Sequence, residues 1–175
     1  ARVEAVLPPA LPREPDWKRS FAFRWRKRVN GGGKYLAPVL HASTIRLEDL
    51  QHVDAQKRAI EQNTKQFVLR RPANNVLLTG ARGTGKSSLI KACLNGFASE
   101  GLRLIEVDKA DLADLPDIAD LVAGRPERFV IFCDDLSFEE GEAGYKAPKV
   151  ALDGSISAQS DNVLIYATSN RRHLM

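Results

Sequence analysis

Four short stretches of the chain consist largely of apolar residues, and segments with helical periodicity separate them. Continuous apolar runs of this length are typical of buried strands. Strands that alternate with helices predict a parallel sheet with helices on both faces, so the expected fold class is three-layer α/β. The four predicted strands cover residues 76–78, 102–107, 129–133 and 162–168.

The segments around these strands predict helices. Val53, Ile60 and Phe67 recur every seven residues, which gives a helix over 54–68 one apolar face. Asp54 suits the position that caps its first turn. Further helices are predicted over residues 86–98, 116–122 and, with Pro148 inside it, about 145–152.

The period changes to two over residues 21–29. Aromatic residues occupy odd positions there, and Arg24, Arg26 and Arg28 occupy even positions, which predicts an extended strand with one aromatic and one arginine face. Three consecutive glycines follow, and residues 35–39 can form a second extended piece. A small basic arm or hairpin is therefore expected before the core.

Length and composition fit one compact domain of 175 residues, 43% hydrophobic and 27% charged. Such values exclude a collagen-like, fully disordered or disulfide-scaffold chain. No run of 18 apolar residues and no signal segment occurs in the sequence, so we expect no membrane span and a cytoplasmic location. The expected organisation is a Pro-rich tail (1–17), a basic and aromatic arm (18–44) and a core (45–175). The ends, Ala1 and Met175, suggest part of a larger protein.

Charge is unevenly distributed along the chain. Residues 1–40 hold nine Lys/Arg and three Asp/Glu, whereas residues 101–175 hold eight and fourteen. The two cysteines, Cys93 and Cys133, both lie in apolar segments and are expected to be buried, reduced thiols. Together with three scattered histidines they have no zinc-like spacing.

A glycine-rich turn follows the first predicted strand and matches the pattern G-x-x-x-x-G-K-[ST]. Its backbone N–H groups and the positive end of the next helix are suited to phosphate oxygens. Lys86 is expected to reach the β- and γ-phosphates, and the Ser87 hydroxyl to bind Mg²⁺. The predicted nucleotide-binding residues are Gly80, Ala81, Arg82, Gly83, Thr84, Gly85, Lys86, Ser87 and Ser88.

Two adjacent acids, Asp134 and Asp135, end the third predicted strand. A bound Mg²⁺ explains why two carboxylates stand together at a sheet edge, and Asp134 is the expected metal residue. Asp135 can orient or deprotonate the attacking water, although Glu139 and Glu140 are rival bases. Capping of a neighbouring helix is the alternative role for the acid pair.

The fourth predicted strand ends in Thr168-Ser169-Asn170. If this strand lies between those that carry the glycine-rich loop and the acid pair, Asn170 lies beside the γ-phosphate and can position the water. Ordinary turn formation is the alternative explanation for this polar end.

These motifs in this order resemble the AAA+ ATPase core. Residues 45–54 resemble the segment that borders adenine in that class, with His52 where glycine is usual. Three strings resemble more closely a bacterial family of predicted AAA+ ATPases known only as a domain of unknown function. They are 74–78 with the loop, 132–141 and 166–173. AAA+ proteins usually have Glu at the position of Asp135.

The resemblance implies a Mg-ATP-binding ATPase that couples hydrolysis to remodelling or loading of a macromolecule, as a homo-oligomeric ring. AAA+ modules continue into a fifth strand, an arginine finger and a helical lid, none of which is present by Met175. Assigning Arg171 or Arg172 as the finger would be a guess. The alternative function is a nucleotide-gated binding module with little hydrolysis. A small-molecule kinase lacks a visible acceptor site, and no guanine-reading motif supports a GTPase.

Nucleic acid is one candidate partner for the predicted arm, because Arg24, Arg26 and Arg28 can neutralise phosphates while aromatic residues stack on bases. The alternative is that the aromatic residues pack on the domain and the arginines meet acids of this chain or of a neighbouring subunit.

Overall fold

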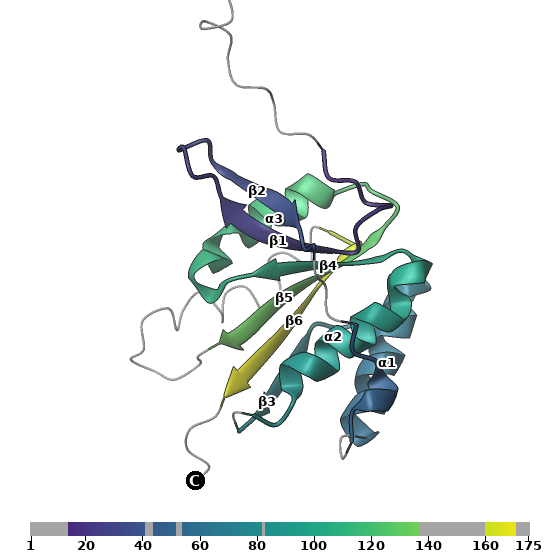
Figure 1. The fold of residues 1–175 in the computed structure, drawn as a ribbon. Coiled ribbons are helices and arrows are strands. Elements are labelled where there is room, and N and C mark those ends of the chain that lie inside the picture. Colours follow the sequence, from purple (N-terminus) through teal and green to yellow (C-terminus); the bar gives the residue numbers. More distant parts are fainter. Residues whose placement is uncertain (1–13, 41–43, 52–53, 82, 137–159, 171–175) are drawn as a thin grey trace, which may run out of the picture.

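The computed structural model describes residues 14–40, 44–51, 54–81, 83–136 and 160–170. Six strands form one sheet, and helices cover both of its faces (Figure 1). The strands are β1 (Ala22–Lys27), β2 (Lys34–Pro38), β3 (Val76–Gly80), β4 (Leu102–Val107), β5 (Arg128–Leu136) and β6 (Val163–Asn170). The α-helices are α1 (Asp54–Val68), α2 (Lys86–Phe97) and α3 (Leu115–Val122), and the short 3₁₀ helices are η2 (Leu47–Asp49), η3 (Ala98–Glu100) and η4 (Lys109–Asp114).

The sheet has the order β2-β1-β4-β5-β6-β3. Every neighbouring pair is parallel except the β1–β2 hairpin, which confirms the predicted α/β class with a mostly parallel sheet. β6 lies between β5 and β3, as the prediction for Asn170 requires. Since parallel strands end at the same edge, the loop after β3, the acids of β5 and the end of β6 meet there.

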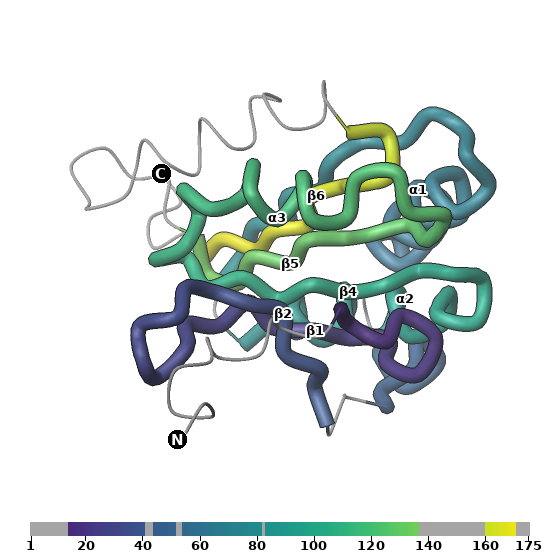
Figure 2. Tube along the Cα trace, turned by 90° about the horizontal axis from the view of Figure 1, so that it is seen from above, coloured from purple at the N-terminus to yellow at the C-terminus, as the bar shows by residue number. Residues whose placement is uncertain are grey.

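Two apolar cores hold the layers together. One core lies between the sheet and helices α1 and α2, where Ile60, Phe67 and Ile90 are buried against β4, β5 and β6. The other lies beneath η4 and α3, where Leu115, Ile118 and Val122 are fully buried. Figure 2 shows α3 and α2 on opposite sides of the strands. Among the described residues, every helix is too short or too polar to span a lipid bilayer.

The two extended pieces predicted near the N-terminus form a hairpin, but it is not a separate arm. β1 pairs in parallel with β4 and therefore extends the core sheet. The aromatic face explains this position, because Phe23 and Trp25 are buried in the same core as α3. The Trp25 indole N–H also donates to Asp114 Oδ2 at 3.0 Å, and Lys34 Nζ pairs with the same carboxylate.

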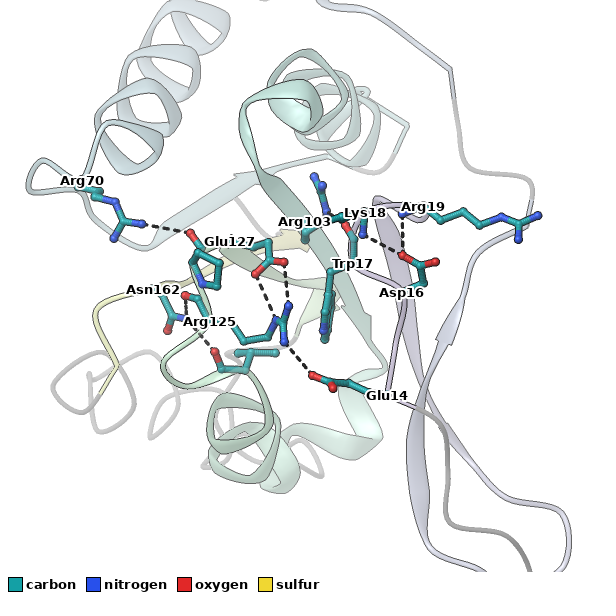
Figure 3. A network of polar contacts seen from close by, with 12 residues as sticks. Glu14, Asp16, Trp17, Lys18, Arg19, Arg70, Arg103, Arg125, Glu127 and Asn162 are labelled. Carbon is teal, nitrogen blue, oxygen red and sulfur yellow. Dashed lines mark hydrogen bonds and ion pairs between the residues drawn. The ribbon is translucent and has the colours of Figure 1, made fainter.

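At the amino ends of the strands, a polar network attaches residues 14–19 to the core (Figure 3). Arg103 donates to the backbone oxygens of Trp17, Ala98 and Leu102 at 2.5–2.8 Å. Arg125 joins Glu14 to Glu127 at 2.7 and 3.1 Å. Residues 14–19 are thereby held at the end of the sheet opposite the loop after β3.

The predicted strands and helices are confirmed wherever the structure describes them, with bounds that differ by at most three residues. The helix over Asp54–Val68 has the predicted bounds. β5 and β6 continue beyond the predicted apolar runs into polar residues. The helix predicted near 145–152 and most of the predicted tail (1–17) lie outside the described residues.

Candidate functional site

The glycine-rich loop connects β3 to α2 and is shaped by left-handed backbone. Gly83 and Gly85 have φ values of 81° and 82°, which glycine adopts at little cost. A Cβ atom at either position would meet no atom within 4 Å, so conformation rather than crowding requires glycine here. Thr84 Oγ1 donates to Ala81 O at 2.9 Å and closes the turn. Open space thus lies in front of the loop, where the N-terminus of α2 points.

Lys86, the first residue of α2, reaches back over this loop. Its Nζ atom donates to Ala81 O at 2.7 Å, to Gly80 O at 3.2 Å and to Thr84 Oγ1 at 3.3 Å. These three acceptors hold the ammonium group at the loop, where it can exchange carbonyl oxygens for those of an anionic ligand. Arg82 lies outside the described residues.

Ser87 and Asp134 come together from different elements, 47 residues apart in the chain. The Ser87 hydroxyl donates to Asp134 Oδ1 at 2.6 Å, and the Thr168 hydroxyl donates to the same oxygen. The Asp134 carboxylate of β5 therefore accepts hydrogen bonds from a hydroxyl of α2 and a hydroxyl of β6 at the edge of the sheet.

Asp135 takes an unusual backbone conformation, with φ of 58°. The β5–β6 register shifts between Cys133 and Leu136, so the two acids occupy a bulge that turns them toward the edge of the sheet. Asn170 Nδ2 donates to Asp135 Oδ1 at 2.7 Å, and Lys109 Nζ lies 3.7 Å from Oδ2. The Asp135 N–H donates to Thr168 Oγ1 at 2.9 Å.

These groups surround a cavity of about 320 Å³. The predicted residues that line it come from the loop, α2, β5 and β6, and Gly80 and Ala81 adjoin it through their bonds to Lys86. The cavity is lined by Gly83, Thr84, Gly85, Lys86, Ser87, Ser88, Asp134, Asp135, Thr168 and Asn170. The structure thus brings together the predicted loop, acid pair and Asn170. The rival bases Glu139 and Glu140, and Arg171 and Arg172, lie outside the described residues.

The segment predicted to border adenine does not line this cavity where it is described. Ile45 O accepts a hydrogen bond from Asn95 Nδ2 at 3.0 Å, and Leu47 and Leu50 pack against the α1–α2 core. Asn95 lies nine residues along α2 from Lys86, which separates them by about 14 Å. His52 lies outside the described residues.

Sequence reasoning gave no role to Thr168 or Lys109. Thr168 touches both acids, but its pairing with Leu78 and its place opposite the bulge appear only once the strands are ordered. Lys109 follows β4, and only the neighbouring positions of β4 and β5 bring it to Asp135.

The oxygen atoms at this site suit Mg²⁺. Hard cations prefer carboxylate and hydroxyl oxygens, and Mg²⁺ usually takes only one or two protein ligands beside phosphate and water. Ser87 and Asp134 supply such a pair. Within the described residues no cluster of three or more His, Cys, Asp or Glu side chains could hold a metal.

A strand, a glycine-rich loop on a helix N-terminus, and acids and an amide at the ends of two neighbouring strands resemble the arrangement in AAA+ P-loop proteins. The chain belongs to the family described as "Protein of unknown function (DUF815)", whose model matches residues 18–175.

Three solved structures share this fold. The AMPPCP-bound DnaA protein of Aquifex aeolicus is 18% identical and matches 74% of this chain and 43% of its own, with a TM-score of 0.50. PCH-2 of C. elegans is 17% identical and matches 79% of this chain and 42% of its own, with a TM-score of 0.52. The ORC1 protein of Aeropyrum pernix in complex with DNA is 16% identical and matches 70% of this chain and 40% of its own, with a TM-score of 0.53.

A curated relative, a probable spastin homolog of Brugia malayi, is 26% identical over 167 residues. The match covers 80% of this chain but 36% of the relative. The chain therefore spans about a third to two fifths of the length of the proteins that it resembles.

Proposed function

We propose that this protein binds Mg-ATP in the cavity at the carboxyl edge of the sheet and hydrolyses it to drive remodelling or loading of a macromolecule. One observation carries the proposal: Lys86, the Ser87–Asp134 pair and the Asp135–Asn170 pair line one cavity in front of an open glycine-rich loop. The AMPPCP ligand of the structurally similar DnaA protein supports the choice of adenine nucleotide.

Each group has a proposed role. The loop N–H groups and Lys86 bind phosphate oxygens. Ser87 and Asp134 would hold Mg²⁺, which supplies charge neutralisation at the phosphates when it is bound. Asp135 accepts the proton of the attacking water, and Asn170 fixes the position of that water and of the Asp135 carboxylate. We further propose a homo-oligomeric ring in the cytoplasm, on the resemblance to AAA+ proteins.

Phosphate release by wild-type protein and by an Asp135→Asn variant tests this function. The variant keeps the side-chain shape but loses the base, so we expect ATP affinity to stay within about threefold and turnover to fall by about 100-fold. Asp117→Asn, which changes an exposed acid on α3 outside the cavity, is the matched control and should retain full turnover. Normal turnover of Asp135→Asn would remove Asp135 as the base, and absence of ATP binding by wild type would refute the proposal.

A second candidate function is a nucleotide-gated binding module with little hydrolysis. The contact of Lys109 with Asp135 favours it, because Lys109 Nζ lies 3.7 Å from Oδ2 of Asp135 and Asn170 binds Oδ1, so that an attacking water must compete with both contacts. Lys109→Met separates the two functions. An ATPase restrained by Lys109 should turn over faster in this variant, whereas a binding module should show the same low rate and unchanged nucleotide affinity.

A further inference from the structure

Among the residues that the structure describes, no helix covers one face of the β1–β2 hairpin. Helices α1 and α2 cover β4, β5, β6 and β3, and their core reaches β1 only at Ala22. Beyond Ala22, the side chains at even positions of β1 point to the same side of the sheet as α2. They lie outside the area that α2 covers. The odd positions, Phe23 and Trp25, are buried on the opposite side.

Arginines occupy this uncovered face. Arg24 and Arg26 are exposed, and Arg28 lies with its guanidinium carbon 4.7 Å from the centre of the Tyr35 ring. Alternate residues on a strand are about 6.7 Å apart, so the backbone positions of the three arginines follow one extended line. We call Arg24, Arg26, Arg28 and Tyr35 the arginine surface.

Among the described residues, Glu106 of β4 is the carboxylate that forms an ion pair with the arginine surface. Glu106 Oε2 accepts from Arg24 at 2.7 Å, and Oε1 lies 3.2 Å from Lys91 Nζ of α2. Among the described residues, Arg26 and Arg28 form no ion pair. Two cations thus share one acid while two more arginines have none, which leaves the surface with a net positive charge.

The arginine surface also adjoins the nucleotide site. A second cavity, of about 370 Å³, runs from Arg24 past Lys91 and Lys109 to Asp134 and Asp135. A ligand on the arginine surface would therefore lie at the mouth of a polar cavity that ends at the acids of the proposed ATPase.

We propose that the arginine surface binds the phosphate backbone of a nucleic acid strand. Arginines at alternate positions of an extended segment suit a linear polyanion, because arginine pairs with phosphate through two parallel hydrogen bonds. The buried positions of Phe23 and Trp25 exclude these two as base-stacking groups, and we assign the contact to the backbone, independent of base sequence. This inference deepens the proposed function by naming the class of its macromolecule.

Fluorescence anisotropy with a labelled oligo-dT strand, across a series of salt concentrations and without nucleotide, tests the proposal. Each neutralised phosphate of a single strand contributes about −0.7 to the slope of log affinity against log salt. Arg26→Ala/Arg28→Ala should therefore weaken binding and make the slope less negative by about 1.4. Because no nucleotide is present, strand binding and ATP hydrolysis can fail separately.

The matched control is Arg58→Ala/Lys65→Ala, which removes the same charge from the exposed side of α1. It should keep the wild-type slope. An equal slope for wild type and for the arginine-surface variant would overturn the proposal, as would a wild-type affinity that does not depend on salt. Competition by polyglutamate that equals competition by unlabelled oligo-dT, charge for charge, would replace the nucleic acid by an acidic protein.

A variant with the opposite expected effect removes misfolding as an explanation. Glu106→Gln frees Arg24 from its ion pair and adds one cation to the surface. We expect tighter strand binding at low salt and a slope more negative by about 0.7. Weaker or unchanged binding of Glu106→Gln would contradict the role of the arginine surface.

Discussion

The two ends of the sheet use charge in opposite ways. At the amino end, Arg103 and Arg128 are each 7% exposed, and fixed backbone oxygens accept their hydrogen bonds. At the carboxyl end, Lys86 and Asp135 face a cavity and contact groups that can exchange them for a ligand. A charge surrounded by fixed acceptors stabilises the fold, whereas a charge beside open space is available for binding and chemistry.

Burial explains the difference at the amino end. Burial lowers the pKa of the Arg103 and Arg128 guanidinium groups, because the charged form loses water. Each is compensated by carbonyl oxygens and by an aromatic ring, Phe21 for Arg103 and Phe67 for Arg128. Removing such a group leaves those oxygens without a donor and therefore costs folding free energy.

The largest expected effect is on binding at the carboxyl end. Lys86→Ala removes the cation that the loop holds, so ATP affinity should fall at least about 100-fold, or about 2.7 kcal/mol. The lysine is replaced at a solvent-facing site, and the free energy of unfolding should change by less than about 1 kcal/mol. Isothermal titration with ATP and urea denaturation measure the two quantities. Lys65→Ala on α1 should change neither ATP affinity nor the free energy of unfolding. Normal ATP affinity of Lys86→Ala would contradict the claim that charges at the carboxyl end of the sheet serve binding.

The reverse pattern is expected at the amino end. Arg103→Met keeps the packing of the stem but loses the donors to Trp17, Ala98 and Leu102, and we expect a loss of about 3 kcal/mol in unfolding free energy. ATP affinity of the folded fraction should stay within about twofold. Urea denaturation of this variant is compared with Arg19→Met, an exposed arginine of the same segment, which should cost under about 0.5 kcal/mol. Equal stability of the two variants would mean that Arg103 is not a structural charge.

The sequence predicts the carboxyl end better than the amino end. The glycine-rich loop and the acid pair follow apolar strands, and parallel strands must end at a common edge, so Lys86, Ser87 and Asp134 could be brought together on pattern alone. Nothing in the periodicity of residues near Arg103 indicates that it is buried, because its acceptors are backbone oxygens, one of them on the distant Trp17. A backbone carbonyl has no sequence signature.

The β1–β2 hairpin is another feature that the sequence predicts only in part. Its period of two predicts the strands and their aromatic face, but not the partner that buries this face. The free edge of β4 accepts β1 because Phe23 and Trp25 complete the core beneath α3. The bulge at Asp135 is likewise set by pairing with β6 and is not visible in one strand alone.

Thr168 provides a smaller test of the carboxyl end. The Thr168 hydroxyl orients Asp134 and accepts a hydrogen bond from the Asp135 N–H. In Thr168→Val, the gain in ATP affinity that Mg²⁺ provides should therefore be about tenfold smaller than in wild type. Titration of ATP at a series of Mg²⁺ concentrations measures this effect. Affinity for ATP without Mg²⁺ should be unchanged, as should both affinities in Thr44→Val, an exposed control. Equal losses with and without Mg²⁺ would show that Thr168 serves only the fold.

The smallest effect is expected at an ion pair near the carboxyl end but outside the nucleotide cavity. Hydrogen bonds from Lys34 and then Trp25 hold the pKa of Asp114 below its ordinary value of 3.8. A lowered folded-state pKa stabilises the fold above the ordinary value, and this contribution is lost as pH falls through the folded value.

Asp114→Asn should therefore lower Tm at pH 7 by about 2 °C, because a surface pair contributes little. The difference from wild type should shrink as pH falls below 3.8, where wild-type Asp114 becomes protonated. Thermal denaturation of both proteins between pH 7 and pH 2.5 measures the convergence, with Asp117→Asn on α3 as the control that should follow wild type throughout. Curves for Asp114→Asn and wild type that stay parallel to pH 2.5 would show that the carboxylate charge does not fasten the hairpin. The hairpin would then be held by the pairing of β1 with β4 and by the burial of Phe23 and Trp25, without a contribution from the Asp114 charge.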